Sequence, residues 1–417
     1  ICPRLADDWA KWKRGVTMKY IVILGDGMAD EPVEALGGKT PLEAVDTPYM
    51  DSIAHNGASG TFLTLPEGFP TSSDAANMSV LGYELASFYP GRGPIEATSR
   101  GIQLGPDDIA WRCNLVTVEN GILRDYSAGH ISKERAKAFM DALAAKFNSD
   151  KVTFCSGVSY RNLLVLHGAE FSADVDYFKP DSSQDLPVSE LRMKAKTPAA
   201  QHTVDFVEKL MADAAAFLAD HPLNKNGEVP ANWIWPWSPG RKPSFPGFSG
   251  KYDGRSAAVI TAVDVISGIA KCAGMDVIPV EGATGYLDTN YAGKAEAAIK
   301  AIENHDFVYV HLEAIDECSH EGNLQHKMQA ISDLENKIIK PVMTALAGRD
   351  LTFAILPDHP VPLRLRAHTR TPVPVAICGP HIVPDAVRHY SEKDAPKGSL
   401  GFMHGEEFVR KVLNIEK

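Results

Sequence analysis

The sequence predicts an α/β fold in which a sheet core is flanked by helices and interrupted by a smaller inserted α+β domain. Short apolar runs typical of buried strands alternate with amphipathic helical segments along most of the 417 residues. The runs Tyr20 to Leu24, Phe307 to Leu312 and Leu351 to Leu356 are the clearest strands. Carboxylates or imidazoles follow each run, and this is where functional groups gather in parallel sheets.

The core is predicted to consist of residues 18–105 and 200–417. A helix over Asn77 to Leu85 continues from a serine-rich loop. The second part carries helical spacing from His202 to Ala219, and then strands and helices alternate. The remaining expected core elements are the strands Ala257 to Thr261, Val277 to Pro279 and Pro372 to Ile377, and the helices Asp264 to Ala273 and Gly293 to Asn304.

An inserted domain is predicted for residues 106–199, because its elements have more apolar faces than the main sheet can cover. The expected order is a strand, a turn, a helix and two strands, followed by a polar loop from Ser182 to Pro198. These elements are Ile109 to Val118, Glu119 to Gly121, Lys133 to Lys146, Val152 to Ser156 and Asn162 to Leu166.

Three tryptophans, Trp233, Trp235 and Trp237, alternate along the chain as they would on a half-buried strand. Packing in a core or at a domain interface is favoured over ligand stacking. The opening residues 1–17 lack the apolar core of a secretory signal. We interpret them as a leader or an added segment, with Met18 as the natural start.

Composition excludes several classes of partner. The net charge of −11 argues against a nucleic-acid surface or an anionic membrane surface, where a basic excess is expected. No apolar run has the length of a membrane span. The six cysteines are scattered and form no C-x-x-C pair, so they are predicted to be reduced thiols of a cytoplasmic protein. The oligomeric state is not predicted.

Six side chains at strand ends are candidate metal ligands. Asp316 and His320 lie four residues apart, so on a helix they would share one face. Asp358 and His359 are adjacent, so both can reach one ion only from an irregular loop. The flanking Pro357 and Pro360 supply this irregularity. Taken alone, each motif also fits a structural role without a metal, such as a turn at Asp26 or an exposed helical turn at Asp316. The candidates are Asp26, Asp316, His320, Asp358, His359 and His368.

Together these ligands favour two divalent ions, because the set is too large for one tetrahedral ion. Oxygen and nitrogen ligands suit manganese first, with magnesium, cobalt or zinc as alternatives. Cys318 lies between two candidate ligands. We predict that it is a bystander, because a thiolate would make an oxygen-rich site softer.

The motifs resemble those of the alkaline-phosphatase superfamily, and most closely the archaeal-type, cofactor-independent phosphoglycerate mutases. The resemblance covers nearly all of the chain from Met18 onward and implies an alkaline-phosphatase-like sheet core. The motifs that carry it are Gly25-Asp-Gly27, Ser73-Asp74, Leu81-Gly-Tyr83, Asp316-x-x-x-His320, Asp358-His359, His368-Thr-x-x-Pro-Val-Pro-Val, Gly38 to Glu43, Thr47 to Asp51, Gly91 to Glu96 and Gly282 to Tyr286.

The resemblance implies that Ser73 is the nucleophile, which forms a phosphoserine and is also a metal ligand. It implies one ion held by Asp26, Asp358, His359 and Ser73, and a second ion held by Asp316, His320 and His368. Ser72 is the alternative nucleophile, and it stands where the family usually has glycine.

Substrate contacts are expected from bases, because a carboxylate and a phosphate suit arginine forks. The candidates are Arg92, Arg112, His130, Arg161 and Lys294, and the alternative for each is a solvated surface base. In the segment Asp125 to His130 the sequence departs from the archaeal mutases, where basic residues are expected at Tyr126, Ser127 and His130.

The predicted function is therefore the metal-dependent interconversion of 3-phosphoglycerate and 2-phosphoglycerate, a glycolytic and gluconeogenic step on a small phosphorylated substrate. The departure at 125–130, together with the opening motif Gly25 to Asp30, also resembles a bacterial subgroup of proposed homoserine kinases. A metal-dependent phosphatase is a further alternative. A regulatory metal-binding protein without activity is disfavoured, because all seven centre residues are present.

Overall fold

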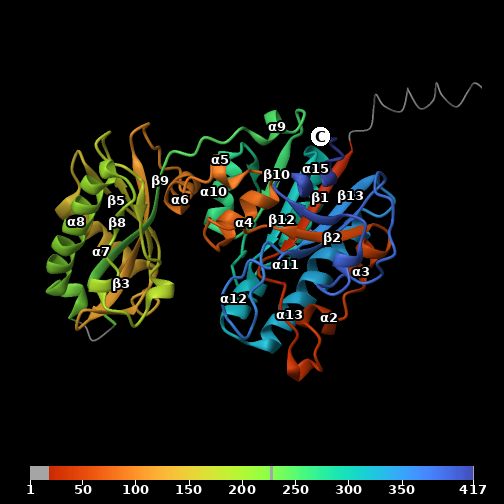
Figure 1. Ribbon diagram of the computed structural model, residues 1–417, viewed down its shortest axis with the longest axis horizontal. Helices are drawn as coiled ribbons and strands as arrows, with labels where there is room; N and C mark the ends of the chain where they lie inside the picture. Colours follow the sequence, from red (N-terminus) through yellow and green to blue (C-terminus); the bar gives the residue numbers. More distant parts are fainter. Residues whose placement is uncertain (1–17, 226–228, 417) are drawn as a thin grey trace, which may run out of the picture. The chain divides into compact units, whose positions relative to one another are not determined.

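The computed structural model describes residues 18–225 and 229–416 (Figure 1). The predicted leader, residues 1–17, lies outside this range. The described chain divides into two compact units. Unit 2 is Pro90–Ser244, and unit 1 comprises the described residues on either side of it.

Unit 1 is built on an eight-stranded mixed sheet, which confirms the predicted α/β core. All neighbouring strands run parallel except β14, which is antiparallel to both of its neighbours. In spatial order the strands are β11 (Asp276–Val277), β10 (Ala257–Ile260), β12 (Phe307–Leu312), β1 (Lys19–Gly25), β13 (Leu351–Leu356), β14 (Val373–Cys378), β2 (Ala58–Leu63) and β15 (Gly401–His404).

Both faces of the sheet are covered, which explains why its central strands are continuous apolar runs. On β1, Ile21 and Ile23 belong to a core shared with the helices α3 (Pro48–His55), α11 (Tyr291–Asn304), α13 (Leu324–Leu334) and α14 (Lys340–Ala345). On the other face, the hydroxyl of Tyr20 donates to the carbonyl of Leu413 on α15 (Glu407–Leu413). Tyr309 of β12 points to α4 (Ser73–Val80) on that same face.

The helices of unit 1 can be followed in Figure 1. They are α2 (Pro41–Ala44), α3 (Pro48–His55), α4 (Ser73–Val80), α5 (Leu85–Phe88), α9 (Phe248–Lys251), α10 (Asp264–Cys272), α11 (Tyr291–Asn304), α12 (Ala314–His320), α13 (Leu324–Leu334), the π-helix η6 (Glu335–Ile339), α14 (Lys340–Ala345) and α15 (Glu407–Leu413), with 3-10 turns at η1 (Glu34–Leu36) and η7 (Ala395–Lys397).

Unit 2 is an α+β unit around a five-stranded sheet in which β3 pairs with β4, β6 and β9. All of the β3 pairings are antiparallel. Its elements are α6 (Arg92–Ser99), β3 (Ile109–Glu119), β4 (Ile122–Asp125), α7 (Lys133–Phe147), β5 (Val152–Val158), β6 (Arg161–Leu166), β7 (Val175–Asp176), β8 (Lys194–Ala195), α8 (Gln201–Ala219) and β9 (Trp233–Arg241), with 3-10 turns at η2 (Asp181–Ser183), η3 (Val188–Glu190), η4 (Pro198–Ala200) and η5 (Pro222–Asn224).

The bounds of unit 2 differ from the predicted insert at 106–199. The tryptophan strand β9 pairs with β3, and Trp235 and Trp237 are buried in a core that includes residues of α8. Helix α6 also packs on β3, since a Cβ added to Gly93 would lie 2.2 Å from the carbonyl oxygen of Ala110. The packing role predicted for the tryptophans therefore holds for Trp235 and Trp237. The helices α6 and α8 and the strand β9, which the prediction places in the core, belong to unit 2.

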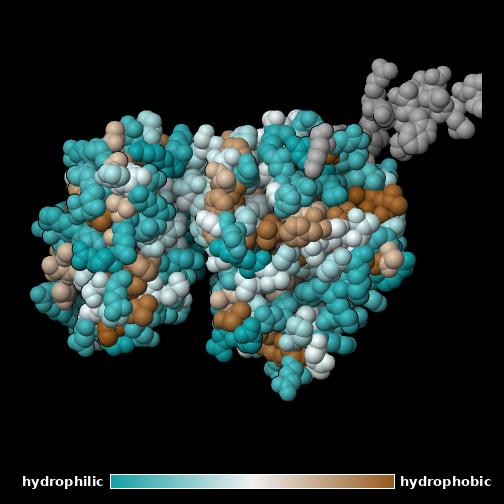
Figure 2. All heavy atoms as spheres, viewed as in Figure 1, coloured by the Kyte–Doolittle hydropathy of each residue, from teal (hydrophilic) through white to brown (hydrophobic). Residues whose placement is uncertain are grey.

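Within the described part of the chain, no helix combines the length and apolar character needed to cross a membrane. On the face shown in Figure 2, the surface is mostly hydrophilic, with hydrophobic side chains in small patches. Among the exposed hydrophobic residues, Val383 is 81% and Phe402 is 56% accessible.

Candidate active site

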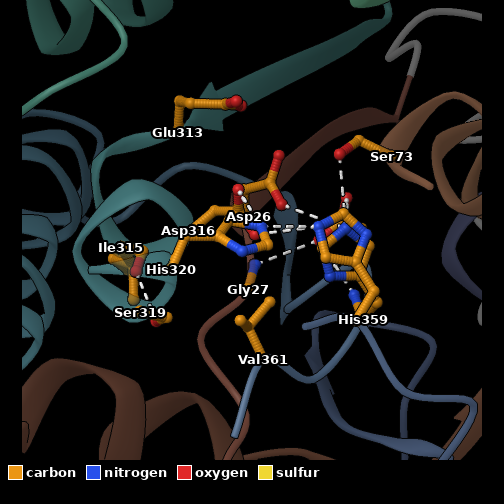
Figure 3. A network of polar contacts seen from close by, with 12 residues as sticks. Asp26, Gly27, Ser73, Glu313, Ile315, Asp316, Ser319, His320, His359 and Val361 are labelled. Atoms are coloured by element: carbon orange, nitrogen blue, oxygen red, sulfur yellow. Dashed lines mark hydrogen bonds and ion pairs between the residues drawn. The ribbon is translucent and has the colours of Figure 1, made fainter. Parts of the chain in front are cut away.

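Helix α4 begins at Ser73 and places this hydroxyl beside a polar cluster. Ser72 precedes the helix in an extended conformation. The Oγ atom of Ser73 lies 3.2 Å from Nε2 of His359, as the dashed line in Figure 3 shows. The Oγ atom of Ser72 is buried and makes no hydrogen bond in the structure. The geometry thus distinguishes the two serines, and only Ser73 points at the cluster.

The first predicted ligand group comes together at the ends of β1 and β13. Asp26 and the pair Asp358 and His359 are fully buried. Nε2 of His359 lies 3.4 Å from Oδ1 of Asp26 and 3.4 Å from Oδ2 of Asp358. The loop conformation after β13 lets both adjacent side chains face the same point, and the three residues form a group that could hold a metal ion.

The second predicted group also comes together. Asp316 and His320 share one face of α12, as their spacing predicted, and His368 reaches them from the loop before β14. The Nε2 atoms of His320 and His368 are 2.8 Å apart, and each lies within 3.5 Å of a carboxylate oxygen of Asp316. This arrangement, with three ligand atoms facing one position, is a second candidate metal group.

The buried carboxylates of the cluster create a negative charge that bound cations would neutralise. Burial, and then the charges of Asp358 and Glu313, raise the pKa of Asp26 well above its ordinary value. Burial also raises the pKa of Asp358. For Asp316 the hydrogen bond to His320 and the charges of His368 and His320 outweigh burial, and its pKa is lowered. Carboxylates forced together in a dry site need compensating positive charge.

Buried carboxylate oxygens without hydrogen bonds provide a second test of whether the two groups suit metal ions. Oδ1 of Asp26 and Oδ1 of Asp316 are buried without a hydrogen bond. Buried carboxylate oxygens are rarely left without a partner, and these two belong to the two ligand groups. The residues present therefore suit divalent ions with oxygen and nitrogen ligands.

The predicted bases of unit 2 lie beside two aromatic rings, and Arg161 and His130 share the first of these, Tyr160. The guanidinium of Arg161 lies 5.2 Å from the ring centroid of Tyr160, and the ring of His130 lies 6.4 Å from the same ring. Arg112 is buried and close enough to Arg161 and Arg92 for their charges to lower its pKa, after burial as the main cause. The four candidates from unit 2 are thus brought together.

An acidic residue holds part of this basic cluster in place. Glu96 on α6 pairs with Arg92 at 2.7 Å, with Arg100 at 3.4 Å and with Arg112. Arg92 and Arg112 also lie over the ring of Trp237. Arg112 is therefore a buried, paired side chain, whereas Arg161 is exposed.

Comparisons with known proteins agree with this geometry. A sequence profile described as 2,3-bisphosphoglycerate-independent phosphoglycerate mutase matches residues 54–224. A protein of that name from Methanosarcina acetivorans is 44% identical over 405 residues, which is 95% of this chain and 100% of the relative. The chain belongs to the 2,3-bisphosphoglycerate-independent phosphoglycerate mutase family. This confirms the family that the motifs implied.

Other relatives place the chain in the same mutase family. A protein named as a probable mutase of this kind from Geobacter sulfurreducens is 42% identical, covering 95% of this chain and all of the relative. A solved Pyrococcus horikoshii protein superposes with a TM-score of 0.81 at 26% identity, covering 97% of this chain and 99% of that one. A cofactor-independent phosphoglycerate mutase from Thermoplasma acidophilum gives 0.64 at 27% identity, with 95% and 99% covered.

Sequence reasoning missed several polar residues of this mutase-family site. Nε2 of His311 lies 3.0 Å from Oδ2 of Asp26, and both residues form a further candidate metal group with Glu313. Burial, followed by the charge of Lys294, lowers the pKa of His311 to about 3, whereas burial and Asp316 raise the pKa of Glu313 to about 8. The available signal was a histidine inside the otherwise apolar run Phe307–Leu312.

Asn77 is a further missed residue. Its Nδ2 donates to the carbonyl oxygen of Ser73 at 2.8 Å and to Oδ2 of Asp358 at 2.9 Å. The hydroxyl of Tyr309 donates to Oδ1 of Asn77. Asn77 therefore ties the helix that begins at Ser73 to the loop that carries the candidate ligands Asp358 and His359. Its position one helical turn after Ser73 was the only sequence signal.

Lys294, the predicted base of unit 1, is fully buried on α11, and its Nζ donates to the carbonyl of His311 at 3.2 Å. Burial lowers its pKa to about 8 despite the charge of Glu313. The ammonium is thus bound to the strand that carries His311, and its predicted substrate contact stays a prediction. Cys318 is buried and belongs to neither ligand group, although it forms a separate candidate group with Glu321 and His326.

Proposed function

We propose that this chain interconverts 3-phosphoglycerate and 2-phosphoglycerate through a phosphoserine on Ser73. The observation that carries the proposal is the position of Ser73 Oγ at the start of α4, 3.2 Å from a histidine of the carboxylate cluster. The relatives named as phosphoglycerate mutases match this chain over almost its whole length. A serine held among potential metal ligands is suited to nucleophilic attack on phosphorus.

The proposed reaction consists of two successive phosphoryl transfers. First, Oγ of Ser73 loses its proton and bonds to phosphorus as the bond to the 3-oxygen of the substrate breaks, and that oxygen takes up a proton. Glycerate stays bound. Then its 2-oxygen loses a proton and bonds to phosphorus, the bond to Ser73 breaks, and the serine hydroxyl is restored. No nucleotide is consumed.

We further propose two divalent ions, with manganese as the physiological one. Asp26, Asp358, His359 and Ser73 would hold one ion, and Asp316, His320 and His368 would hold the other. When bound, the ions would favour the alkoxide of Ser73 and neutralise the charge of the transferring phosphoryl group. The protein's own part is orientation. Asn77 positions the backbone of Ser73 and the carboxylate of Asp358 through its two hydrogen bonds.

The basic residues are proposed as substrate contacts. Arg92, Arg112, His130 and Arg161 gather on unit 2, and guanidinium groups can hold a carboxylate or phosphate with paired hydrogen bonds. Lys294 is proposed as a contact only if its ammonium leaves the carbonyl of His311. We also propose a cytoplasmic enzyme of glycolysis and gluconeogenesis, with a small phosphorylated metabolite as its partner.

The proposal is tested by incubating the purified, manganese-loaded protein with 3-phosphoglycerate and no nucleotide. We expect 2-phosphoglycerate, detected by coupling to enolase, with little free phosphate. Parallel incubations contain homoserine with ATP, or a generic phosphate ester. Formation of phosphohomoserine without any 2-phosphoglycerate would identify a kinase instead, and stoichiometric release of phosphate would identify a phosphatase.

A further inference from the structure

Lys327 on α13 is a buried lysine to which the reaction assigns no role. Its side chain is completely inaccessible, and its ammonium faces oxygen atoms from two loops. Nζ donates to Oδ2 of Asp30 at 2.8 Å, to the carbonyl of Val361 at 3.0 Å and to the carbonyl of Gly27 at 3.1 Å. These contacts use the three N–H bonds of the ammonium, so its burial is compensated.

Gly27 is where the two ligand groups meet. It follows Asp26, and its N–H donates to Oδ1 of Asp358 at 3.2 Å. Its Cα packs against the second group, because a Cβ at this position would lie 2.7 Å from Oδ1 of Asp316. The residue also has a φ of 63°, which favours glycine. A shift of the Gly27 peptide would therefore move one group relative to the other.

The loop after β13 is joined to the same point. Val361 follows the ligand pair Asp358 and His359, and its N–H donates to the carbonyl of Ala29 at 3.1 Å. The carboxylate of Asp30 accepts from the N–H of Leu363. Figure 3 shows Gly27 and Val361 next to each other beneath Asp26. Lys327 thus binds the backbone of both loops that carry the first ligand group.

Lys327 also belongs to the segment that follows the second group. Helix α13 comes directly after α12, which carries Asp316 and His320, and the two helices pack together. The ammonium is therefore a point where three segments meet: the loop after β1, the loop after β13 and α13. Removing its charge would leave two carbonyls and a carboxylate facing one another in a dry site, and their repulsion would separate the segments.

We propose that Lys327 is a positioning residue that sets the spacing between the two ligand groups. It thereby sets the affinity for whichever divalent ion binds second, when the other ion is already in place. The inference rests on the two-ion site of the proposed function. It assigns Lys327 no contact with substrate. Lys327 acts through the Gly27 and Val361 peptides, which hold Asp26, Asp358 and His359 in place.

The test compares Mn²⁺ binding by the metal-stripped wild-type protein and the Lys327→Met variant, using equilibrium dialysis and electron paramagnetic resonance. The wild type should bind two ions and show a spin-coupled Mn–Mn signal. Lys327→Met should bind the second ion about 10- to 100-fold more weakly, as other losses of outer-sphere support do, and should lose the coupled signal. In Lys327→Ala, added ethylammonium should restore the coupled signal, because it returns a cation to the oxygen atoms.

Lys337→Met is the matched control. Lys337 is a lysine of the adjoining π-helix that is half-exposed and paired with Asp333, and its removal should leave both ions and their coupling unchanged. A folded Lys327→Met protein that binds two ions with wild-type affinity and coupling would overturn the proposal. If that variant does not fold, Asp30→Asn decides: weaker binding of the second ion supports the proposal, and unchanged binding overturns it.

Failure of the proposed function gives a different result. A wild-type protein that binds two coupled ions but forms no 2-phosphoglycerate would contradict the mutase activity alone, because the positioning role is measured by metal binding. A wild-type protein that binds only one ion would overturn both the two-ion site and the role of Lys327.

Discussion

The imidazole rings of His359 and His368 are stacked, with their centroids 3.8 Å apart and their planes inclined by 25°. Each ring belongs to a different ligand group. Nε2 of His359 faces Asp26 at 3.4 Å, and Nε2 of His368 faces Asp316 at 3.5 Å. The stack therefore makes the two candidate metal positions neighbours, as expected for a pair of ions that act on one phosphoryl group.

Replacing the proposed nucleophile should abolish turnover without unfolding the protein. Ser73→Ala is expected to lower kcat by at least about 10³-fold, since the covalent step has no substitute. Ser72→Ala, the matched control, should retain activity because its hydroxyl makes no hydrogen bond in the structure. Rates are measured with the enolase-coupled assay, and phosphoserine by mass spectrometry. An active Ser73→Ala together with an inactive Ser72→Ala would show that the other serine reacts.

Removing metal should destabilise unit 1, because its buried carboxylates then repel one another. Binding of one ion at 1,000 times its dissociation constant contributes about 4 kcal/mol to the free energy of unfolding. At about 2–4 °C per kcal/mol, each bound manganese ion should raise the Tm of the chelator-treated protein by roughly 8–16 °C. His368→Ala, which damages one group only, should show a smaller rise. Equal Tm values with chelator and with manganese would argue against any bound ion.

Loss of Asn77 should slow catalysis through misplacement of Ser73 and Asp358. Asn77→Ala is expected to lower kcat by about 10²-fold, the typical cost of a displacement near 1 Å, with little change in KM. Tyr309→Phe is the control, because both donations from Asn77 remain and only the hydrogen bond to its Oδ1 is lost. Steady-state kinetics that show equal loss in both variants would mean that Asn77 has no specific positioning role.

Arg161 should contribute to substrate binding. Arg161→Ala is expected to reduce kcat/KM by about 10²-fold, which corresponds to a lost charge-assisted pair. Arg124→Ala removes an exposed arginine of the same unit, which pairs with Asp185, and should leave kcat/KM unchanged. Both values come from initial rates over a range of 3-phosphoglycerate concentrations. A wild-type kcat/KM in Arg161→Ala would remove this residue from the proposed site.

Glu96 should make the stability of unit 2 dependent on pH. Although burial opposes ionisation, the charges of Arg112, Arg92 and Arg100 lower the pKa of Glu96 from 4.5 to about 2. A carboxylate with a depressed pKa stabilises the folded state above pH 4.5, and this stabilisation is lost as the pH falls towards 2. Burial lowers the pKa of Arg112 to about 10, so the pair contributes less than the Glu96 shift alone implies.

Glu96→Gln should therefore lower the free energy of unfolding by up to about 3 kcal/mol at pH 6, with a smaller difference at pH 3. Denaturant unfolding followed by tryptophan fluorescence measures this, because Trp111 and Trp237 are buried in unit 2. A difference between wild type and variant that stays constant from pH 6 to pH 3 would contradict the depressed pKa.

The central strands and the candidate ligand motifs can be predicted from the sequence alone. The apolar runs of β1, β12 and β13 are buried on both faces, so hydrophobicity marks them without knowledge of their neighbours. The spacing of Asp316 and His320 specifies one helical face, and α12 presents them in that way. These are local properties, which depend on periods of two or 3.6 residues.

The tertiary structure decided the unit boundaries and the supporting residues. Strand β9 joins unit 2 because it pairs with β3, and the sequence between the two strands carries no sign of that pairing. Asn77, His311 and Lys327 are ordinary polar residues in the sequence. They support the site only because folding brings distant carboxylates and carbonyls within hydrogen-bonding distance of them. Burial then makes each such contact matter, since an unpaired polar group in a dry interior is costly.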